Sequence, residues 1–195
     1  MRVRSAMEVE RFSISGPVHF TMPRFGDARG YFTETFNTEK MKVVGITEPH
    51  WVQDNQSCST EVFTLRGLHF QLPPFAQAKI VRVLSGRIYD VAVDLRTKSP
   101  TFAQWIAVEL TSEKQNQLYI PAGFAHGFLT LTSDAVIAYK VSAAYSRTHD
   151  RSLNWADTAL DIKWPLPVGS KPKLSEKDEA APLLVALEHE LMEST

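Results

Sequence analysis

The sequence predicts an all-β protein, a sandwich or a barrel. About ten short segments rich in β-branched and aromatic residues are separated by turn residues. One modest helix is expected near the C-terminus, and no alternating βαβ series appears, which argues against a doubly wound nucleotide fold. A length of 195 residues suits one domain, expected over 1–195, that buries its own core.

The expected elements follow in chain order. Strands are expected at residues 9–14, 18–22, 31–36, 51–57, 62–68, 79–84, 88–95, 102–110, 117–120, 128–132 and 136–141. A short helix is expected at 38–44, with Thr38 as its N-cap. Residues 150–167 are rich in Trp and Pro and indicate loops packed on the body. Ser175 and Asp178 fit a capping pattern, and Pro182 suits the first turn of the final helix.

Composition limits the class of function. The chain has 21 basic and 22 acidic residues and a formal net charge of −1, which argues against a general nucleic-acid binder. The single cysteine, Cys58, rules out an internal disulfide framework and fits a reducing compartment. No signal peptide is visible, and no window approaches the roughly 20 apolar residues that a membrane span needs. A cytoplasmic protein is expected.

The segment from residue 62 to residue 96 contains the most informative polar residues. Arg66, His69 and Lys79 lie there among apolar, β-prone residues, and Ser85-Gly86-Arg87 indicates a hairpin between two strands. A base and two cations on neighbouring strands are typical of one wall of a site for an anionic small molecule.

Two segments match the pattern of the cupin barrels: G-L-H-F-Q, with a downstream Gly86, and P-A-G-F-A-H. Many cupins bind a metal through an H-x-H pair, a following Glu and the His of the second segment. Here Gln71 replaces the second His, so His69 and His126 supply two ligands at most, whereas a tight catalytic metal site has about three. We therefore expect the jelly-roll barrel without a metal. A metal-dependent cupin oxygenase or isomerase is the alternative.

Without a metal, His69 is either a structural histidine or a general base. A nearby cation would stabilise the enolate left when a proton α to a ketone is removed. Tyr139 could return the proton from the opposite face, although its parity with Ile137 and Val141, taken alone, favours a core aromatic residue. Base, enolate stabiliser and acid together describe a cofactor-independent epimerisation.

Other polar residues leave two interpretations open. Glu34 lies between Phe32 and Phe36 on an apolar parity, which indicates either a solvated edge or a carboxylate that points into a cavity. Three successive polar residues, Gln53, Asp54 and Asn55, usually indicate a solvated turn. Their position just before the His69 strand is also compatible with a binding role.

Eight motifs together carry a specific resemblance that covers about residues 12–187. They are F-G-D-A-R-G-Y-F-T-E-T-F, Q-D-N-Q-S, L-R-G-L-H-F-Q, Q-A-K-I-V-R-V, D-V-A-V-D-L-R, S-P-T-F, I-P-A-G-F-A-H-G-F and L-S-E-K-D-E-A-A-P. The chain resembles the dTDP-4-dehydrorhamnose 3,5-epimerase family of metal-free cupin epimerases. Members act on dTDP-4-dehydro-6-deoxyglucose.

The resemblance implies a role for each matching residue. His69 would be the base, Tyr139 the acid and Lys79 the enolate stabiliser, and Asp178 would orient His69. Tyr145 would stack on the thymine. The residues implied to contact nucleotide, diphosphate or sugar are Arg29, Glu34, Gln53, Asp54, Asn55, Arg66, Lys79, His126, Asp150 and Lys177.

The resemblance also implies a homodimer in which N-terminal strands exchange, so that Arg29 and Glu34 reach the partner's site. Asp150 departs from the family pattern, because a Glu is frequent there, and the turn at 72–76 is not a fixed family feature. Besides the metal-dependent cupin enzyme, three alternatives to the 3,5-epimerase remain. They are an epimerase that acts at C3 alone, one for another nucleotide-linked 4-keto sugar, and a non-catalytic binding module.

Overall fold

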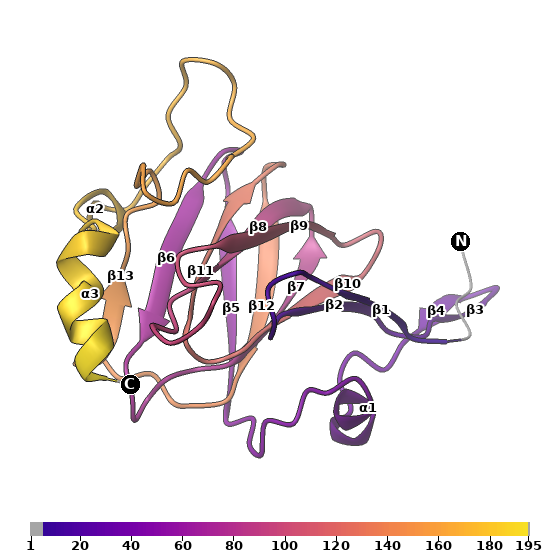
Figure 1. The fold of residues 1–195 in the computed structure, drawn as a ribbon. Helices are drawn as coiled ribbons and strands as arrows, with labels where there is room; N and C mark the ends of the chain where they lie inside the picture. The colour runs from indigo at the N-terminus through magenta and orange to yellow at the C-terminus, as the bar shows by residue number, and fades with distance from the viewer. Residues whose placement is uncertain (1–5, 195) are drawn as a thin grey trace.

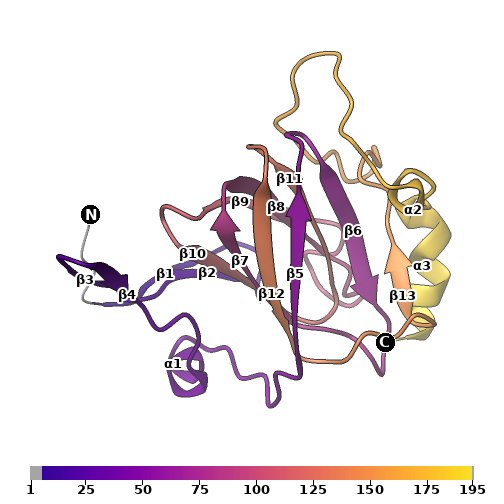
Figure 2. The same cartoon turned by 180° about the vertical axis from the view of Figure 1, so that it is seen from behind.

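A computed structural model describes residues 6–194, which form two antiparallel sheets that face each other (Figure 1, Figure 2). The six-stranded sheet has the order β1 (Glu8–Arg11), β2 (Val18–Thr21), β10 (Asn116–Ile120), β7 (Lys79–Ser85), β12 (Ala135–Val141) and β5 (Gln53–Ser59). The five-stranded sheet has the order β13 (Asp150–Ser152), β6 (Leu65–Gln71), β11 (Phe124–Thr130), β8 (Arg87–Asp94) and β9 (Trp105–Thr111). The expected all-β, jelly-roll architecture is confirmed.

In the described part of the chain, one hairpin and three helices surround the barrel. The β3 (Phe25–Asp27) and β4 (Gly30–Phe32) hairpin projects from it at the N-terminal side, close to α1 (Thr38–Val43) (Figure 1). The short helix α2 (Glu176–Glu179) and the longer α3 (Leu184–Glu193) lie against the five-stranded sheet at the opposite side. No helix within 6–194 is long and apolar enough to cross a membrane.

The barrel interior is apolar, with a few polar exceptions that face inward. Val81 and Val83 on β7, Ile88 and Ala92 on β8, and Ile137 on β12 belong to the cluster of buried side chains between the sheets. Side chains alternate along a strand, so the same inward parity contains Lys79 on β7, Asp90 on β8 and Tyr139 on β12. Strand periodicity therefore places three polar side chains inside the barrel.

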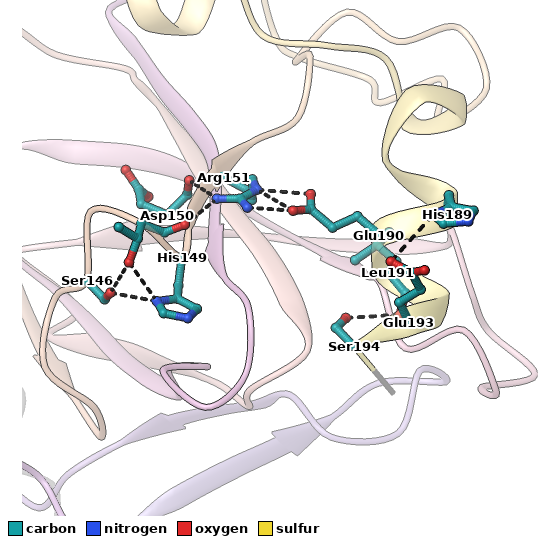
Figure 3. Close-up of polar contacts among 10 residues, drawn as sticks. Ser146, His149, Asp150, Arg151, His189, Glu190, Leu191, Glu193 and Ser194 are labelled. Carbon is teal, nitrogen blue, oxygen red and sulfur yellow. Dashed lines mark hydrogen bonds and ion pairs between the residues drawn. The ribbon is translucent and has the colours of Figure 1, made fainter.

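The outer face of the five-stranded sheet is covered by the C-terminal helix. Leu184, Leu187 and Leu191 of α3 belong to one buried cluster with Val91 and Val93 of β8. An ion pair also joins the helix to the barrel. Figure 3 shows Arg151 of β13 directed at Glu190 of α3, with Nε–Oε2 at 2.9 Å and Nη2–Oε1 at 2.5 Å. Packing and a two-pronged ion pair thus hold α3 next to the strand that begins at Asp150.

Several expected boundaries are wrong. The strand expected at 62–68 begins only at Leu65, because Phe63 adopts a left-handed backbone conformation (φ 60°) in the preceding turn. The strand expected at 31–36 ends at Phe32. Asn37, not Thr38, caps α1, since its side chain accepts a hydrogen bond from the Lys40 amide. β11 begins at Phe124 rather than at 128, and β13 lies in the segment expected to be loop.

Candidate active site

A cavity of about 240 Å³ opens between the two sheets. Six of the residues that the sequence singled out line it: Asn55, Arg66, His69, Lys79, His126 and Tyr139. They come from β5, β6, β7, β11 and β12. The remaining lining residues are Gln56, Ser57, Gln77, Phe128 and Val141.

The imidazole of His69 is paired with a carboxylate from far along the chain. His69 Nε2 lies 2.5 Å from Asp178 Oδ1. Asp178 belongs to α2, which Ser175 caps, and its side chain is only 4% exposed. Burial raises the pKa of Asp178, but the hydrogen bond and the charge of His69 outweigh burial and hold the pKa below its usual value. The carboxylate therefore stays ionised and can hold the ring and stabilise an imidazolium.

An irregularity in β6 explains why Arg66 and His69 line one wall although three positions separate them. The register of β6 with β11 shifts between His126 and Phe128. Gly67 has φ 123°, and a Cβ there would lie 2.5 Å from Gly127 Cα. The two strands approach this closely only because both positions are glycine. Strict alternation would have directed Arg66 and His69 to opposite faces.

Lys79 provides a cation whose charge is poorly solvated. Its Nζ donates a long hydrogen bond of 3.5 Å to the His69 carbonyl. Burial lowers the pKa of Lys79 to about 8, while the charges of Asp150 and Asp90 oppose that change. Near neutral pH the ammonium is still charged. Because the group is buried, little water is present to screen its attraction for a developing oxyanion.

Tyr139 lines the cavity from β12 of the six-stranded sheet, whereas His69 lines it from β6 of the five-stranded sheet. The Tyr139 hydroxyl shares a hydrogen bond of 2.8 Å with the Ser57 hydroxyl of β5. Burial and the charge of Asp90 raise the pKa of Tyr139, whereas Ser57 and Arg66 lower it. The phenol is therefore protonated at neutral pH and can donate a proton or a hydrogen bond.

The rim beside the cavity holds four residues implied to bind substrate: Gln53, Tyr145, Asp150 and Lys177. Tyr145 Oη donates to Asp150 Oδ2 at 3.2 Å, and Lys177 Nζ lies 2.5 Å from the same oxygen. Gln53 Oε1 accepts from the Tyr145 amide at 3.3 Å, and its Nε2 donates to Asn55 Oδ1 at 2.7 Å. Tyr145 is 57% exposed, so its ring is accessible to a planar ligand.

Three of the implied residues lie elsewhere. Arg29 is exposed on the projecting β3–β4 turn, where it pairs with Asp27 at 2.6 Å. Glu34 follows that hairpin and lies 3.3 Å from Lys40 Nζ. Asp54 points to the outer face of the six-stranded sheet, where it pairs with Lys140 at 2.7 Å. Arg29, Glu34 and Asp54 do not line the cavity.

Comparison with known proteins identifies the group to which this architecture belongs. The family described as dTDP-4-dehydrorhamnose 3,5-epimerase matches residues 11–186. A relative of that name from Sinorhizobium fredii is 52% identical over 164 residues, which are 84% of this chain and 83% of the relative. The chain belongs to the dTDP-4-dehydrorhamnose 3,5-epimerase family. The expected family, fold class and epimerase function are thereby confirmed.

Two solved structures are similar to this family member throughout. An epimerase from Bacillus anthracis with TDP and diphosphate bound is 45% identical, with a TM-score of 0.87 over 92% of this chain and 100% of that one. A dTDP-6-deoxy-D-glucose-3,5-epimerase from Legionella pneumophila in complex with dTDP-4-keto-L-rhamnose is 42% identical. Its TM-score is 0.88 over 95% of this chain and 96% of that one.

The donor set for a metal is small in this epimerase. Among the described residues, no group of three or more His, Cys, Asp or Glu side chains is placed to hold a metal ion. Gln71, at the position where many cupins have a ligand, instead donates its amide to the carbonyl oxygens of Phe75 and Ala144.

Two residues near the reacting groups were not selected from the sequence. Ser57 is the hydrogen-bond partner of Tyr139, and no pattern in a polar strand distinguishes it. Asp90 is completely buried beside His126, with Oδ1 2.8 Å from His126 Nε2. A signal for Asp90 did exist, because it is a carboxylate on the apolar parity of β8 between Ile88 and Ala92.

Proposed function

We propose that the protein is a cofactor-independent epimerase of dTDP-4-dehydro-6-deoxy-D-glucose that inverts C3 and C5. The product is dTDP-4-dehydro-L-rhamnose, for dTDP-L-rhamnose biosynthesis. The observation that carries this proposal is the convergence of His69, Lys79 and Tyr139 on one cavity with Asp178 behind His69. A base, a cation and a phenol are the three groups that an enolisation with inversion needs.

Each inversion proceeds through an enolate. His69 removes the proton next to the C4 ketone, and the bond electrons move onto the C4 oxygen. The charge of Lys79 stabilises that oxyanion, and Asp178 stabilises the imidazolium formed on His69. Tyr139 then delivers a proton to the opposite face of the carbon. His69 loses its proton to solvent and Tyr139 regains one, so solvent hydrogen enters each inverted carbon.

The rim residues bind the nucleotide part of the substrate. Tyr145 stacks on the thymine, and Arg66 and Lys177 pair with the diphosphate. Gln53, Asn55, His126 and Asp150 complete the contacts, with Asp150 acting over a shorter reach than a Glu would have.

The protein acts as a homodimer in the cytoplasm, and its 195 residues form one epimerase domain. The projecting β3–β4 hairpin carries Arg29, whose side chain is 90% exposed, and Glu34 follows it. Exchange of N-terminal strands brings both residues to the partner's cavity. This arrangement gives a function to two residues that do not line the cavity of their own chain.

Proton NMR of dTDP-4-dehydro-6-deoxyglucose with the protein in D2O tests the proposal. Loss of both the C3 and the C5 proton signals is expected. Loss at C3 alone would reassign the protein as a 3-epimerase with the same mechanism, and no exchange at either carbon would exclude this substrate or leave a binding module.

A variant separates binding from chemistry. His69→Asn removes the base but keeps the size of the side chain, so exchange should stop while the affinity for dTDP stays within about tenfold, or about 1.4 kcal/mol. Continued turnover by this variant would show that another group is the base. Retention of about one equivalent of Fe, Mn or Zn through EDTA treatment would favour the metal-dependent alternative.

A further inference from the structure

A second carboxylate–imidazole pair lies behind the cavity. His126 Nε2 is 2.8 Å from Asp90 Oδ1, and the register of β8 with β11 places Asp90 opposite Phe128, two positions from the partner of His126. Asp90 is completely buried and His126 is 4% exposed. His126 lines the cavity and Asp90 does not. The carboxylate can therefore reach a bound ligand only through the imidazole.

The pairing determines which nitrogen of His126 carries the proton. Burial lowers the pKa of His126, although Asp90 and its hydrogen bond oppose that change, so the ring is neutral at neutral pH. A carboxylate has only acceptor atoms, and a neutral imidazole has one N–H. Nε2 is consequently the donor to Asp90, and Nδ1 keeps a lone pair.

A comparison on the same strand distinguishes Asp90 from a structural carboxylate. Asp94 is also completely buried on β8, but both of its oxygens are satisfied. Arg96 donates to Oδ1 and Oδ2 at 2.8 Å each, and Ser99 and Thr101 each donate to Oδ2 at 2.7 Å. Asp90 Oδ2, in contrast, has no hydrogen-bond partner among the described residues. A half-satisfied buried carboxylate costs stability, which a role in the site would explain.

We propose that Asp90 is a positioning residue of the epimerase. It holds His126 as the neutral Nε2–H tautomer, so that Nδ1 accepts a hydrogen bond from a hydroxyl group of the bound sugar. Phosphate and ketone oxygens have no hydrogen to donate, so this contact selects a hydroxyl and fixes the sugar ring against His69. The inference rests on the proposed function. It adds a contact between His126 and a sugar hydroxyl that the buried Asp90 makes specific.

The charge of Asp90 also reaches Lys79. The titratable and charged groups that line the cavity with Lys79 or act on its charge are Arg66 and His69 on β6, Asp90 on β8, His126 on β11, Tyr139 on β12, Asp150 on β13 and Lys177 on α2. Of these, Asp150 and Asp90 raise the pKa of Lys79 and Lys177 lowers it, while burial lowers it most. Asp90→Asn should therefore lower this pKa further and move the alkaline limb of kcat/KM to lower pH, an effect of the charge alone that is separate from the hydrogen bond to His126.

The tautomer can be observed directly on the free protein. Two-bond ¹H–¹⁵N correlation spectra of ¹⁵N-histidine-labelled protein report which ring nitrogen is protonated, and His126→Asn assigns the signal by its loss. The wild-type ring should show protonated Nε2 and unprotonated Nδ1. Asp90→Asn should change this pattern, because a carboxamide can donate as well as accept, whereas the matched variant Asp94→Asn should leave it unchanged. A proton on Nδ1 in the wild-type protein would overturn the proposal.

Kinetics test whether Asp90 acts through His126. Asp90→Asn should lower kcat/KM by about 10- to 100-fold, the usual effect of losing a residue that orients an imidazole. The side chain introduced by His126→Asn has an oxygen near the Nδ1 position but no N–H directed at Asp90. In the His126→Asn background, Asp90→Asn should lower kcat/KM further by less than about twofold. Fully additive losses would overturn the proposal.

If His126→Asn fails to fold because it leaves Asp90 unpaired, the spectrum of the Asp90→Asn variant decides instead. A change in the signal of one of the six histidines supports the role, and six unchanged signals overturn it. The tautomer is read without substrate. A wrong tautomer therefore overturns this inference alone, whereas wild-type protein that exchanges neither proton overturns the proposed function.

Discussion

His69 and Asp178 lie 109 positions apart in the chain and 2.5 Å apart in the barrel. The contact joins β6 of the five-stranded sheet to the short helix α2, which Ser175 caps. Because folding lowers the pKa of Asp178, the carboxylate remains charged where it meets the ring. His69, the proposed base, is thus prepared for the positive charge that it would acquire on removing a proton.

Asp178→Asn should therefore slow proton removal without changing the shape of the cavity. The carboxamide keeps the shape but loses the charge that stabilises the imidazolium, so kcat should fall by about 10²- to 10⁴-fold. The rate of deuterium incorporation at C5 measures the effect. Ser175→Ala is the matched control: it removes the helix cap at a cost of about 1 kcal/mol in stability but keeps the carboxylate. Equal losses of rate in both variants would assign Asp178 to the helix alone.

Tyr139→Phe should separate proton removal from inversion. His69 still forms the enolate, but no acid remains on the opposite face, so deuterium should enter with retained configuration while epimer formation falls at least about 100-fold. NMR of recovered substrate distinguishes the two outcomes. Ser57→Ala keeps the phenol and removes only its 2.8 Å partner, so epimer formation should stay within about tenfold. Normal epimer formation by Tyr139→Phe would require a different acid.

Lys79 should produce an alkaline limb of kcat/KM near pH 8. Burial lowers its pKa from 10.5 to about 8, so the charge that stabilises the enolate disappears as pH rises through about 8. For stability the sign is the opposite: the buried charge opposes folding below about pH 8, and this penalty vanishes as pH rises towards 10.5. Lys79→Arg does not titrate in this range, so its residual activity should lack the limb. A limb that persists in this variant belongs to another group.

Gly67→Ala should destabilise the protein by about 2 kcal/mol or more. The position combines φ 123° with a space in which a Cβ would lie 2.5 Å from Gly127 Cα and 2.7 Å from the His126 carbonyl oxygen. Gly169→Ala is the matched control, with φ 79° but nothing within 4 Å, and should cost about 1 kcal/mol. Denaturant unfolding measures both variants. Equal costs would mean that the strands can separate without penalty.

Local patterns predicted the barrel and several inward-facing groups. Alternation with Ile137 and Val141 places Tyr139 on the apolar parity of β12, and the structure shows it packed against the core between the sheets. Taken alone, that pattern favours an inert core aromatic residue, because parity reports the direction of a side chain and not the identity of its neighbours. The position of Asp90 beside Ile88 and Ala92 was equally visible in the sequence, but its partner was not.

Contacts between distant segments could not be predicted from periodicity alone. The capping pattern from Ser175 to Asp178 predicts only that Asp178 belongs to a capped helix. The resemblance to a family was needed to connect Asp178 with His69. Strand 62–68 was expected three residues too early, because the turn that ends at Phe63 depends on a left-handed backbone conformation that propensity does not show for a phenylalanine.

The sequence by itself determined the all-β class, the family and the chemical set of a base, a cation and a phenol, because these depend on residue identity and on alternation between neighbours. The tertiary structure decided which groups meet. The register shift at Gly67 brings Arg66 and His69 to one wall, folding of α2 brings Asp178 to His69, and pairing of β8 with β11 places Asp90 behind His126. Alternation is a property of one strand, whereas register and docking depend on the packing of the whole barrel.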